Sequence, residues 1–208
     1  MPKPEPMRVE LVTLEGSHVR LEPLSRDHHA QLSAISDAAS IWRWMPYDCA
    51  TPEGMRRQIE VWLQQQASGA SVCFATIDLA SQHAAGSTTY MNIDAPNHRL
   101  EIGGTWIAPR WQRSAVNTEA KYLMLRHAFE KLGCIRVEFK TDSLNEKSRN
   151  ALLRIGAQEE GIFRNHMIMP DGRIRHSVYF SIVDSDWPQV KAALEAKLAQ
   201  SRPERSNA

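Results

Sequence analysis

The chain has 208 residues, the length of one domain, and its hydrophobic share of 42% is sufficient for a buried core. Lysine and arginine number 25 and aspartate and glutamate 24, so the formal net charge is +1. This balance gives no support to nucleic-acid or membrane-surface binding, since both favour a basic excess. Any cationic binding site is therefore expected to be local.

The cysteines and the N-terminal segment bear on the compartment. Cys49, Cys73 and Cys134 are widely spaced, and they form neither a CxxC pair nor a metal-ligand pattern. An odd count without an export signal indicates reduced thiols. The first residues carry prolines and charges where a signal peptide has an apolar run, and no segment reaches the length of a membrane span. We therefore expect a cytoplasmic protein without a metal site.

The first half of the chain changes from helical to strand patterns. Residues 1–8 and 200–208 are polar and are predicted to be flexible, which leaves residues 9–199 as the folded domain. Thr51 is a typical helix cap, and Pro52 suits the first position of the helix that follows. The expected elements of this half are a strand over 18–24, helices over 26–38 and 51–66, and strands over 71–79, 86–93 and 98–109.

The second half alternates helices with strands. Gly133 is expected to end one helix, and Asn145 and Gly156 to cap and terminate another. The turn "PDG" joins two long strands into a hairpin. The expected elements are helices over 117–132, 145–156 and 186–198, with strands over 134–141, 159–169 and 173–182. The order of elements predicts an α/β (α+β) domain with a mixed sheet of about seven strands flanked by helices.

The strand "HRLEIGGTWIAP" alternates in polarity and leads into a basic loop. Alternation predicts two opposite sides, one with Leu100, Ile102 and Trp106 and the other with Glu101, Thr105 and Ile107. After the loop, a helix begins near Asn117.

Unpaired N–H groups at a helix N-terminus favour a bound phosphate, and Arg113 adds positive charge. Alternatively, this is a capped surface helix, with Ser114 or Asn117 as cap and Glu119 placed favourably for the helix dipole. Neither GxxxxGK[ST] nor GxGxxG occurs, so a nucleotide-hydrolase loop and a dinucleotide fold are not supported.

Four segments together resemble the GNAT acetyltransferase superfamily, and more narrowly the Rim-type ribosomal-protein N-terminal acetyltransferases. The segments are "RLEPL", "LEIGGTWIAPRWQRSAVNTEA", "TDSLNEKSRNALLRIGA" and "RNHMIMPDGRIRHSVYFSI", and the likeness covers residues 18–182. The resemblance implies a mostly antiparallel sheet with one splayed strand pair, and acetyl-CoA as cosubstrate. It also implies that residues 9–199 form one GNAT-like domain.

The resemblance also implies which residues hold the coenzyme. The family loop reads Gln/Arg-x-x-Gly-x-Gly/Ala and binds the pyrophosphate of acetyl-CoA through main-chain N–H groups. Gln112 matches its first position, whereas Ala115 stands in place of the first glycine and Asn117 in place of the second small residue. The loop residues expected to bind the coenzyme are Gln112, Arg113, Ser114, Ala115, Val116, Asn117 and Thr118.

The family pattern places the reaction beside a bulge in the strand before the loop. Gly103-Gly104 suits such a bulge, because glycine tolerates irregular backbone. The thioester arm is then expected to bond main-chain groups near Trp106 and Ile107. Glu101 is expected to act as the general base on the incoming amine. Alternatively Glu101 is a solvated or salt-bridged strand residue, and His98 is a weaker candidate for the base.

A short helix supplies two further candidates. The resemblance gives Asn145 a hydrogen bond to the pantetheine arm and places Ser148 near the sulfur, although Asn145 can equally be a helix cap. Many family members carry a tyrosine one turn after the Ser148 position, where this chain has Leu152. Ser148 therefore becomes the candidate proton donor to the leaving thiolate. The thiolate needs little assistance to leave, because the pKa of a coenzyme thiol is close to that of a free cysteine.

The acceptor site is the least determined part of the sequence. The segment 41–48 often walls this site in the family, and we expect Trp42 in the core and Trp44 to contact the acceptor. Arg164 is expected to contact an acidic substrate, or else to be an exposed strand residue. The acceptor is expected to be the amine of a small molecule or a peptide N-terminus. A coenzyme-A-binding or interaction protein without turnover stays the alternative, and the last helix could pack on the core or form a homodimer.

Overall fold

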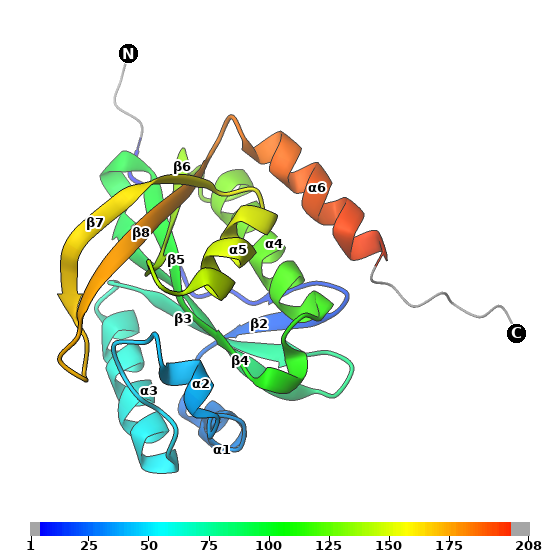
Figure 1. Ribbon diagram of the computed structural model, residues 1–208. Coiled ribbons are helices and arrows are strands. Elements are labelled where there is room, and N and C mark those ends of the chain that lie inside the picture. Colours follow the sequence, from blue (N-terminus) through cyan, green and yellow to red (C-terminus); the bar gives the residue numbers. More distant parts are fainter. Residues whose placement is uncertain (1–4, 201–208) are drawn as a thin grey trace, which may run out of the picture.

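The protein is described by a computed structural model that covers residues 5–200, and it contains one eight-stranded sheet between two groups of helices (Figure 1). The strand order is β1-β2-β3-β4-β5-β6-β8-β7, and only the β5–β6 pair is parallel. The strands are β1 (Leu14–Glu15), β2 (Val19–Pro23), β3 (Val72–Asp78), β4 (His83–Asp94), β5 (Arg99–Ile107), β6 (Arg136–Asp142), β7 (Gln158–Ile168) and β8 (Ile174–Val183). The helices are α1 (His29–Ser33), α2 (Ala39–Trp42), α3 (Pro52–Ala67), α4 (Ala115–Glu130), α5 (Glu146–Arg154) and α6 (Trp187–Gln200).

The predicted fold is confirmed, with one strand more than expected. The additional strand, β1, is only two residues long, and it pairs with β2 through a tight turn. Its shortness explains why no alternating pattern marks it in the sequence. The helix expected over 26–38 is also shorter, since α1 ends at Ser33 and α2 follows as a separate turn.

Hydrophobic side chains fill both faces of the sheet. The face covered by α4, α5 and α6 carries the larger cluster, which includes Leu100, Ile102, Leu123, Met124, Val137, Phe139 and Phe180. The face covered by α1, α2 and α3 carries a second cluster, which includes Trp42, Met55, Ile59, Trp62, Cys73 and Trp106. Within residues 5–200, no helix combines the length and apolar character that crossing a membrane requires.

The ends of the chain differ from the prediction at one point. Residues 1–4 and 201–208, which make up most of the two predicted flexible ends, lie outside the described residues. Met7 is buried, however, and its N–H donates to the Ala95 carbonyl at 3.2 Å. An apolar side chain seven residues before the first strand therefore packs against the main core rather than remaining in solvent.

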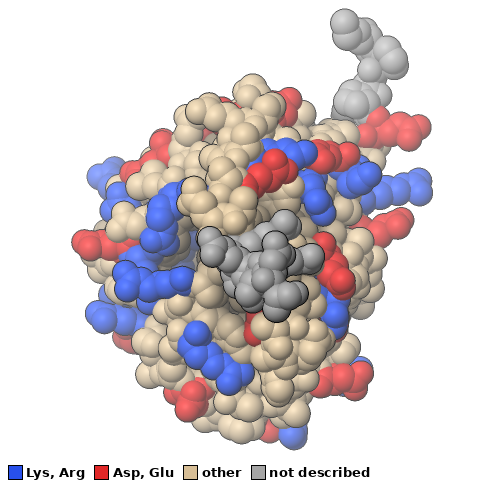
Figure 2. Space-filling model, turned by 90° about the vertical axis from the view of Figure 1, so that its right-hand side faces the viewer, with Lys and Arg blue, Asp and Glu red and all other residues tan. Residues whose placement is uncertain are grey.

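The last helix packs on the core of the same chain. Trp187, Val190 and Leu194 are buried in the larger cluster, and the Trp187 ring stacks on Phe129 of α4 with centroids 5.3 Å apart. Figure 2 shows acidic and basic side chains interspersed over the face at the right of Figure 1. Lysine and arginine side chains gather along the left of this view, whereas acidic and basic side chains are mixed at its right.

Candidate active site

A bulge interrupts β5 at the glycine pair that the sequence singled out. Thr89 of β4 pairs with Gly103, whereas Ser87 pairs with Trp106, so β5 has one extra residue in this stretch. Gly104 adopts a left-handed backbone with φ of +57°, a conformation that glycine tolerates best. The bulge reverses the alternation that follows it. Trp106 therefore packs on the α1–α3 face, and the expectation that it shares a side with Leu100 and Ile102 is wrong.

The parallel strands β5 and β6 separate beside this bulge. They pair over only three residues, from Arg99 opposite Arg136 to Glu101 opposite Glu138. Beyond Glu101, β5 remains paired with β4 as far as Ile107, while β6 remains paired with β8 as far as Asp142. The sheet therefore contains the predicted splayed strand pair, and its gap opens immediately after Glu101.

The Glu101 carboxylate lies at the start of this gap. Its side chain is 3% exposed, and Oε2 accepts a hydrogen bond from Asn92 Nδ2 at 2.8 Å. Lys140 Nζ lies 3.5 Å from the same oxygen, which is the ion pair of the alternative interpretation. A Cβ atom at Gly103 would come within 2.9 Å of Oε1, so the carboxylate extends along β5 towards the bulge. An ion pair and a catalytic role are compatible, because the carboxylate still faces the bulge.

The loop after β5 leads into α4 two residues earlier than predicted. Ser114 is the N-cap, since its Oγ accepts from the Val116 N–H at 3.3 Å, and the helix starts at Ala115. Ala115 and Asn117 therefore have helical backbone, where the absence of glycine costs little. Arg113 takes the left-handed conformation instead, with φ of +66°. Its exposed side chain stands next to the first-turn N–H groups, which have no partner within the helix.

Gln112 links the three elements around the gap. Its Nε2 donates to the Ile107 carbonyl at the end of β5 at 2.9 Å. Its Oε1 accepts from Lys147 Nζ, in the first turn of α5, at 2.6 Å. The N-termini of α4 and α5 are thus held close to the end of β5 by one side chain.

Glu119 has a role that the sequence did not indicate. Its carboxylate accepts hydrogen bonds from the backbone N–H groups of Ser17, His18 and Val19, at 2.9, 2.6 and 2.8 Å. The expectation that it only complements the helix dipole was incomplete, since it fastens the turn between β1 and β2 to the first turns of α4. A side chain at Gly16 would collide with this carboxylate, at 2.4 Å.

In the short helix α5, Asn145 acts as the predicted cap. Its side chain accepts from the Ser148 N–H at 3.1 Å, and α5 begins at Glu146. Ser148 is half-buried on the first turn of this helix. The coenzyme contacts of both residues remain predictions, as does the proton transfer from Ser148.

The residues predicted for the acceptor differ in their surroundings. Trp42 is 5% exposed and packs on Trp106 with centroids 5.1 Å apart, so its expected place in the core is confirmed. Trp44 is half-buried between the guanidinium groups of Arg43 and Arg173, at 4.8 and 5.5 Å from the ring centroid. Arg164 is exposed on β7.

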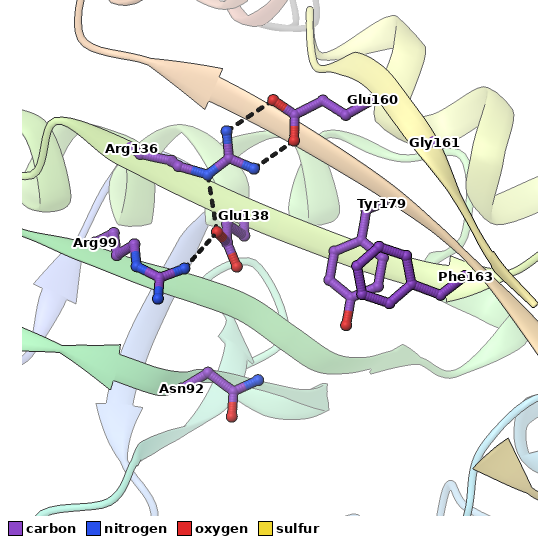
Figure 3. A pocket seen from close by; sticks show the side chains of 8 residues that line it. All are labelled: Asn92, Arg99, Arg136, Glu138, Glu160, Gly161, Phe163 and Tyr179. Atoms are coloured by element: carbon purple, nitrogen blue, oxygen red, sulfur yellow. Dashed lines mark hydrogen bonds and ion pairs between the residues drawn. The ribbon is translucent and has the colours of Figure 1, made fainter. Parts of the chain in front are cut away.

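A pocket of about 410 Å³ lies on the same face as Glu101 (Figure 3). It is lined by Asn92, Arg99, Arg136, Glu138, Glu160, Gly161, Phe163 and Tyr179. The Phe163 and Tyr179 rings lie against each other at 4.3 Å, while the arginines and glutamates are paired with one another. The pocket reaches the candidate base through Asn92, which is bonded to Glu101.

Lys121 was missed by the sequence reasoning. Lys121 is 6% exposed, on the side of α4 that packs against the sheet. Its Nζ donates to Thr105 Oγ1 in the bulge at 2.6 Å. Burial lowers the pKa of its ammonium to about 7. A signal was present, since Lys121 is three and four residues before Met124 and Leu125 of the apolar stripe.

Comparison with known proteins agrees with this geometry. A family described as "Acetyltransferase (GNAT) domain" matches residues 18–158. That span is more than half of the chain, and the chain belongs to the GNAT acetyltransferase family.

Individual relatives support the assignment. Over 102 residues the chain is 34% identical to YdaF of Bacillus subtilis, whose name presents it as a candidate ribosomal N-acetyltransferase. The match covers 49% of this chain and 55% of that protein, so the chain spans about half the length of this curated relative.

Solved structures extend the likeness to the whole fold. A GCN5-related N-acetyltransferase from Brucella melitensis is 36% identical, with a TM-score of 0.87 and coverage of 100% of this chain and 95% of that one. Mycobacterium smegmatis RimJ, solved in complex with CoA-disulfide, is 22% identical with a TM-score of 0.76. That match covers 90% of this chain and 93% of the other, and at such low identity it indicates the fold alone.

Proposed function

We propose that this protein transfers the acetyl group of acetyl-CoA directly to an amine. The observation that carries the proposal is the gap between β5 and β6, which opens beside a buried carboxylate and ends at a helix N-terminus. The coenzyme-bound structure of the RimJ protein, which shares the fold, supports the choice of cosubstrate. A cytoplasmic location stays a prediction.

The residues around the gap fit the coenzyme. Arg113 and the first-turn N–H groups of α4 would hold the pyrophosphate, with Ser114, Val116 and Thr118 forming the rest of the cradle. Gln112 would act by orienting this loop, because both ends of its amide are already bonded. The absence of glycine does not block the approach of a phosphate, since Ala115 and Asn117 have helical backbone.

Catalysis would then depend on four groups of this chain. When bound, the coenzyme supplies an activated acetyl thioester. Main-chain groups at Trp106 and Ile107 would hold the acetyl carbonyl and the arm beside the bulge. Glu101 would accept the proton that the acceptor ammonium must lose before it becomes a nucleophile. Asn145 would hold the pantetheine arm, and Ser148 would donate a proton to the leaving thiolate.

Thiol release with a panel of amines tests this proposal. The wild-type protein should release free thiol from acetyl-CoA only when an acceptor amine is present. Glu101→Gln should lower kcat by about 100-fold or more while coenzyme binding stays within about twofold. The matched control Glu53→Gln, at an exposed position of α3, should retain full activity.

Two results would contradict the proposal. Tight coenzyme binding without acceptor-dependent thiol release over a broad panel would favour the binding protein without turnover. The absence of a thermal shift with acetyl-CoA, at concentrations far above usual dissociation constants, would exclude both functions.

A further inference from the structure

A buried guanidinium that has no carboxylate partner within residues 5–200 lies on the sheet face that carries Glu101. Arg175 is 5% exposed in β8. The register places it on this face, since Glu101 pairs with Glu138, Glu138 pairs with Ser181, and side chains two residues apart on β8 share a side. We expect the acceptor to approach Glu101 over the same face, because the pocket on this face reaches Glu101 through Asn92.

The hydrogen bonds of Arg175 use only part of its capacity. Nε donates to Ser177 Oγ at 3.0 Å, and one terminal nitrogen donates to the Trp44 carbonyl at 3.4 Å. A guanidinium carries five N–H groups. Within residues 5–200, no carboxylate oxygen lies within the 4.0 Å of an ion pair with Arg175. Three N–H groups therefore remain for a ligand.

The two carboxylates that act on Arg175, those of Asp142 and Glu101, already form ion pairs with other cations. Asp142 accepts from Arg173 at 2.7 Å, and Glu101 is paired with Lys140 at 3.5 Å. The cluster thus contains three cations and two anions, namely Lys140, Arg173 and Arg175 against Glu101 and Asp142. Within residues 5–200 one buried positive charge, that of Arg175, therefore has no anion in contact with it, and burial of a charge without such a contact is costly.

Polar and aromatic side chains surround this uncompensated charge. His166 Nδ1 bonds to the same Ser177 hydroxyl that accepts from Arg175, at 3.0 Å. The backbone carbonyl of Trp44 accepts a hydrogen bond from Arg175. The Trp44 ring provides an apolar surface, over which the Arg173 guanidinium lies. These residues come from the α2–α3 connection and from the β7–β8 hairpin, two segments that are far apart in the sequence. Their convergence places hydrogen-bonding and aromatic groups around the guanidinium on the same face of the sheet as Glu101.

We infer, on the basis of the proposed function, that the acceptor amine carries a carboxylate, which Arg175 binds while the amine is presented to Glu101. A planar guanidinium matches a carboxylate with two parallel hydrogen bonds, so it fixes the orientation of the acceptor as well as its charge. A free amino acid and a peptide with an acidic side chain near its N-terminus share this chemistry. Arg175 thus takes the role in acidic-substrate binding that the sequence suggested for Arg164.

Matched pairs of acceptors test the inference. Each pair consists of an acid and its amide: an amino acid with its carboxamide, and a short peptide having aspartate or asparagine next to its N-terminal residue. For the wild-type protein, kcat/KM should be about 10- to 100-fold higher for the acid member, the range expected for hydrogen bonds to a charged group. The pair with the larger ratio identifies the source of the carboxylate.

Variants connect the preference to Arg175. Arg175→Gln should abolish the acid-to-amide ratio by lowering kcat/KM for the acid and leaving the amide nearly unchanged. Arg175→Lys should keep part of the ratio, because it retains the charge without the planar fork. The control Arg56→Gln, at an exposed position of α3, should keep the full ratio. If the Arg175 variants do not fold, the ratio of the wild-type protein decides alone.

Failure of the inference can be separated from failure of the proposed function. Equal kcat/KM for acid and amide, with both acetylated, would refute the inference and leave the acetyltransferase activity intact. If no amine is acetylated, product binding tests the carboxylate site instead. An N-acetylated amino acid should then raise the midpoint of thermal unfolding of the coenzyme-loaded protein more than its carboxamide does. Equal shifts would refute the carboxylate site.

Discussion

Replacement of Lys121 by methionine should stabilise the protein at neutral pH. Within residues 5–200 the ammonium has no carboxylate partner, and it donates to the hydroxyls of Thr105 and Thr88 at 2.6 and 3.3 Å. Burial lowers its pKa from 10.5 to about 7. This shift corresponds to a loss of about 5 kcal/mol in the free energy of unfolding at pH values where the native protein carries the charged ammonium. Methionine has a similar shape and no charge to desolvate.

Part of this gain is offset by lost hydrogen bonds. The two threonine hydroxyls bond to each other at 2.8 Å, so they keep a partner after the substitution. Each lost bond to Nζ is worth about 1 kcal/mol. Lys121→Met should therefore raise the free energy of unfolding at pH 7 by about 2–4 kcal/mol.

The pH dependence isolates the effect of the charge. Between pH 7 and 10.5 the unfolded chain binds a proton at Lys121 that the native state does not. The free energy of unfolding of the wild-type protein should therefore rise with pH in this window relative to that of the variant. Below pH 7 the difference between the two proteins should no longer depend on pH. By pH 9.5 the difference between the two proteins should shrink by about 3 kcal/mol.

Urea unfolding followed by tryptophan fluorescence at pH 7 and 9.5 measures both quantities. Lys131→Met, at the exposed C-terminal end of the same helix, serves as the control and should show no such pH dependence. Destabilisation of Lys121→Met at pH 7, or a constant difference between pH 7 and 9.5, would refute the reasoning. Lys121 would then be held charged by an interaction that its burial does not reveal.

Three further substitutions probe the frame of the site. Glu119→Gln should lower the free energy of unfolding by about 2–4 kcal/mol, because a neutral amide oxygen replaces a carboxylate that accepts three N–H bonds, as measured by urea unfolding. Gly103→Ala should lower kcat about tenfold or more, since its Cβ would come within 2.9 Å of the Glu101 carboxylate and displace it. Gln112→Ala should raise the Kd for acetyl-CoA about tenfold in calorimetry, with a stability loss of about 1 kcal/mol, because it unties the loop from β5 and α5.

Two of these substitutions have a control variant, and each of the three has a result that would contradict it. Glu195→Gln removes a carboxylate from a single exposed bond, and a loss as large as that of Glu119→Gln would mean that the three N–H bonds carry no special weight. Ser68→Ala, at the exposed C-terminal end of α3, should leave kcat unchanged. If Gly103→Ala also leaves kcat unchanged, the placement of Glu101 is not needed for the reaction. An unchanged Kd for the coenzyme in Gln112→Ala would show that this side chain does not orient the loop for coenzyme binding.

The sequence predicted the elements because their signals are local. The apolar stripe of α4, the cap at Asn145 and the hairpin around "PDG" each depend on neighbouring residues, and the structure contains all three. The glycine pair in β5 also marked the bulge correctly. Its consequence was missed, because one extra residue reverses which face every later side chain occupies, as Trp106 demonstrates.

The sequence by itself predicted the fold class, a strand-loop-helix unit expected to hold a diphosphate, and a glutamate beside a bulge. Only the tertiary structure decided which charges are buried and which of them are paired. Glu119 finds its partners about one hundred residues earlier, and Lys121 lies beneath the bulge. Arg175 lies on the same face of the sheet as Glu101, and no carboxylate within residues 5–200 forms an ion pair with it. A charged residue in an amphipathic segment looks the same in sequence whether it faces water or the core. Its burial depends on the long-range packing of other elements over it, and that packing leaves no local pattern.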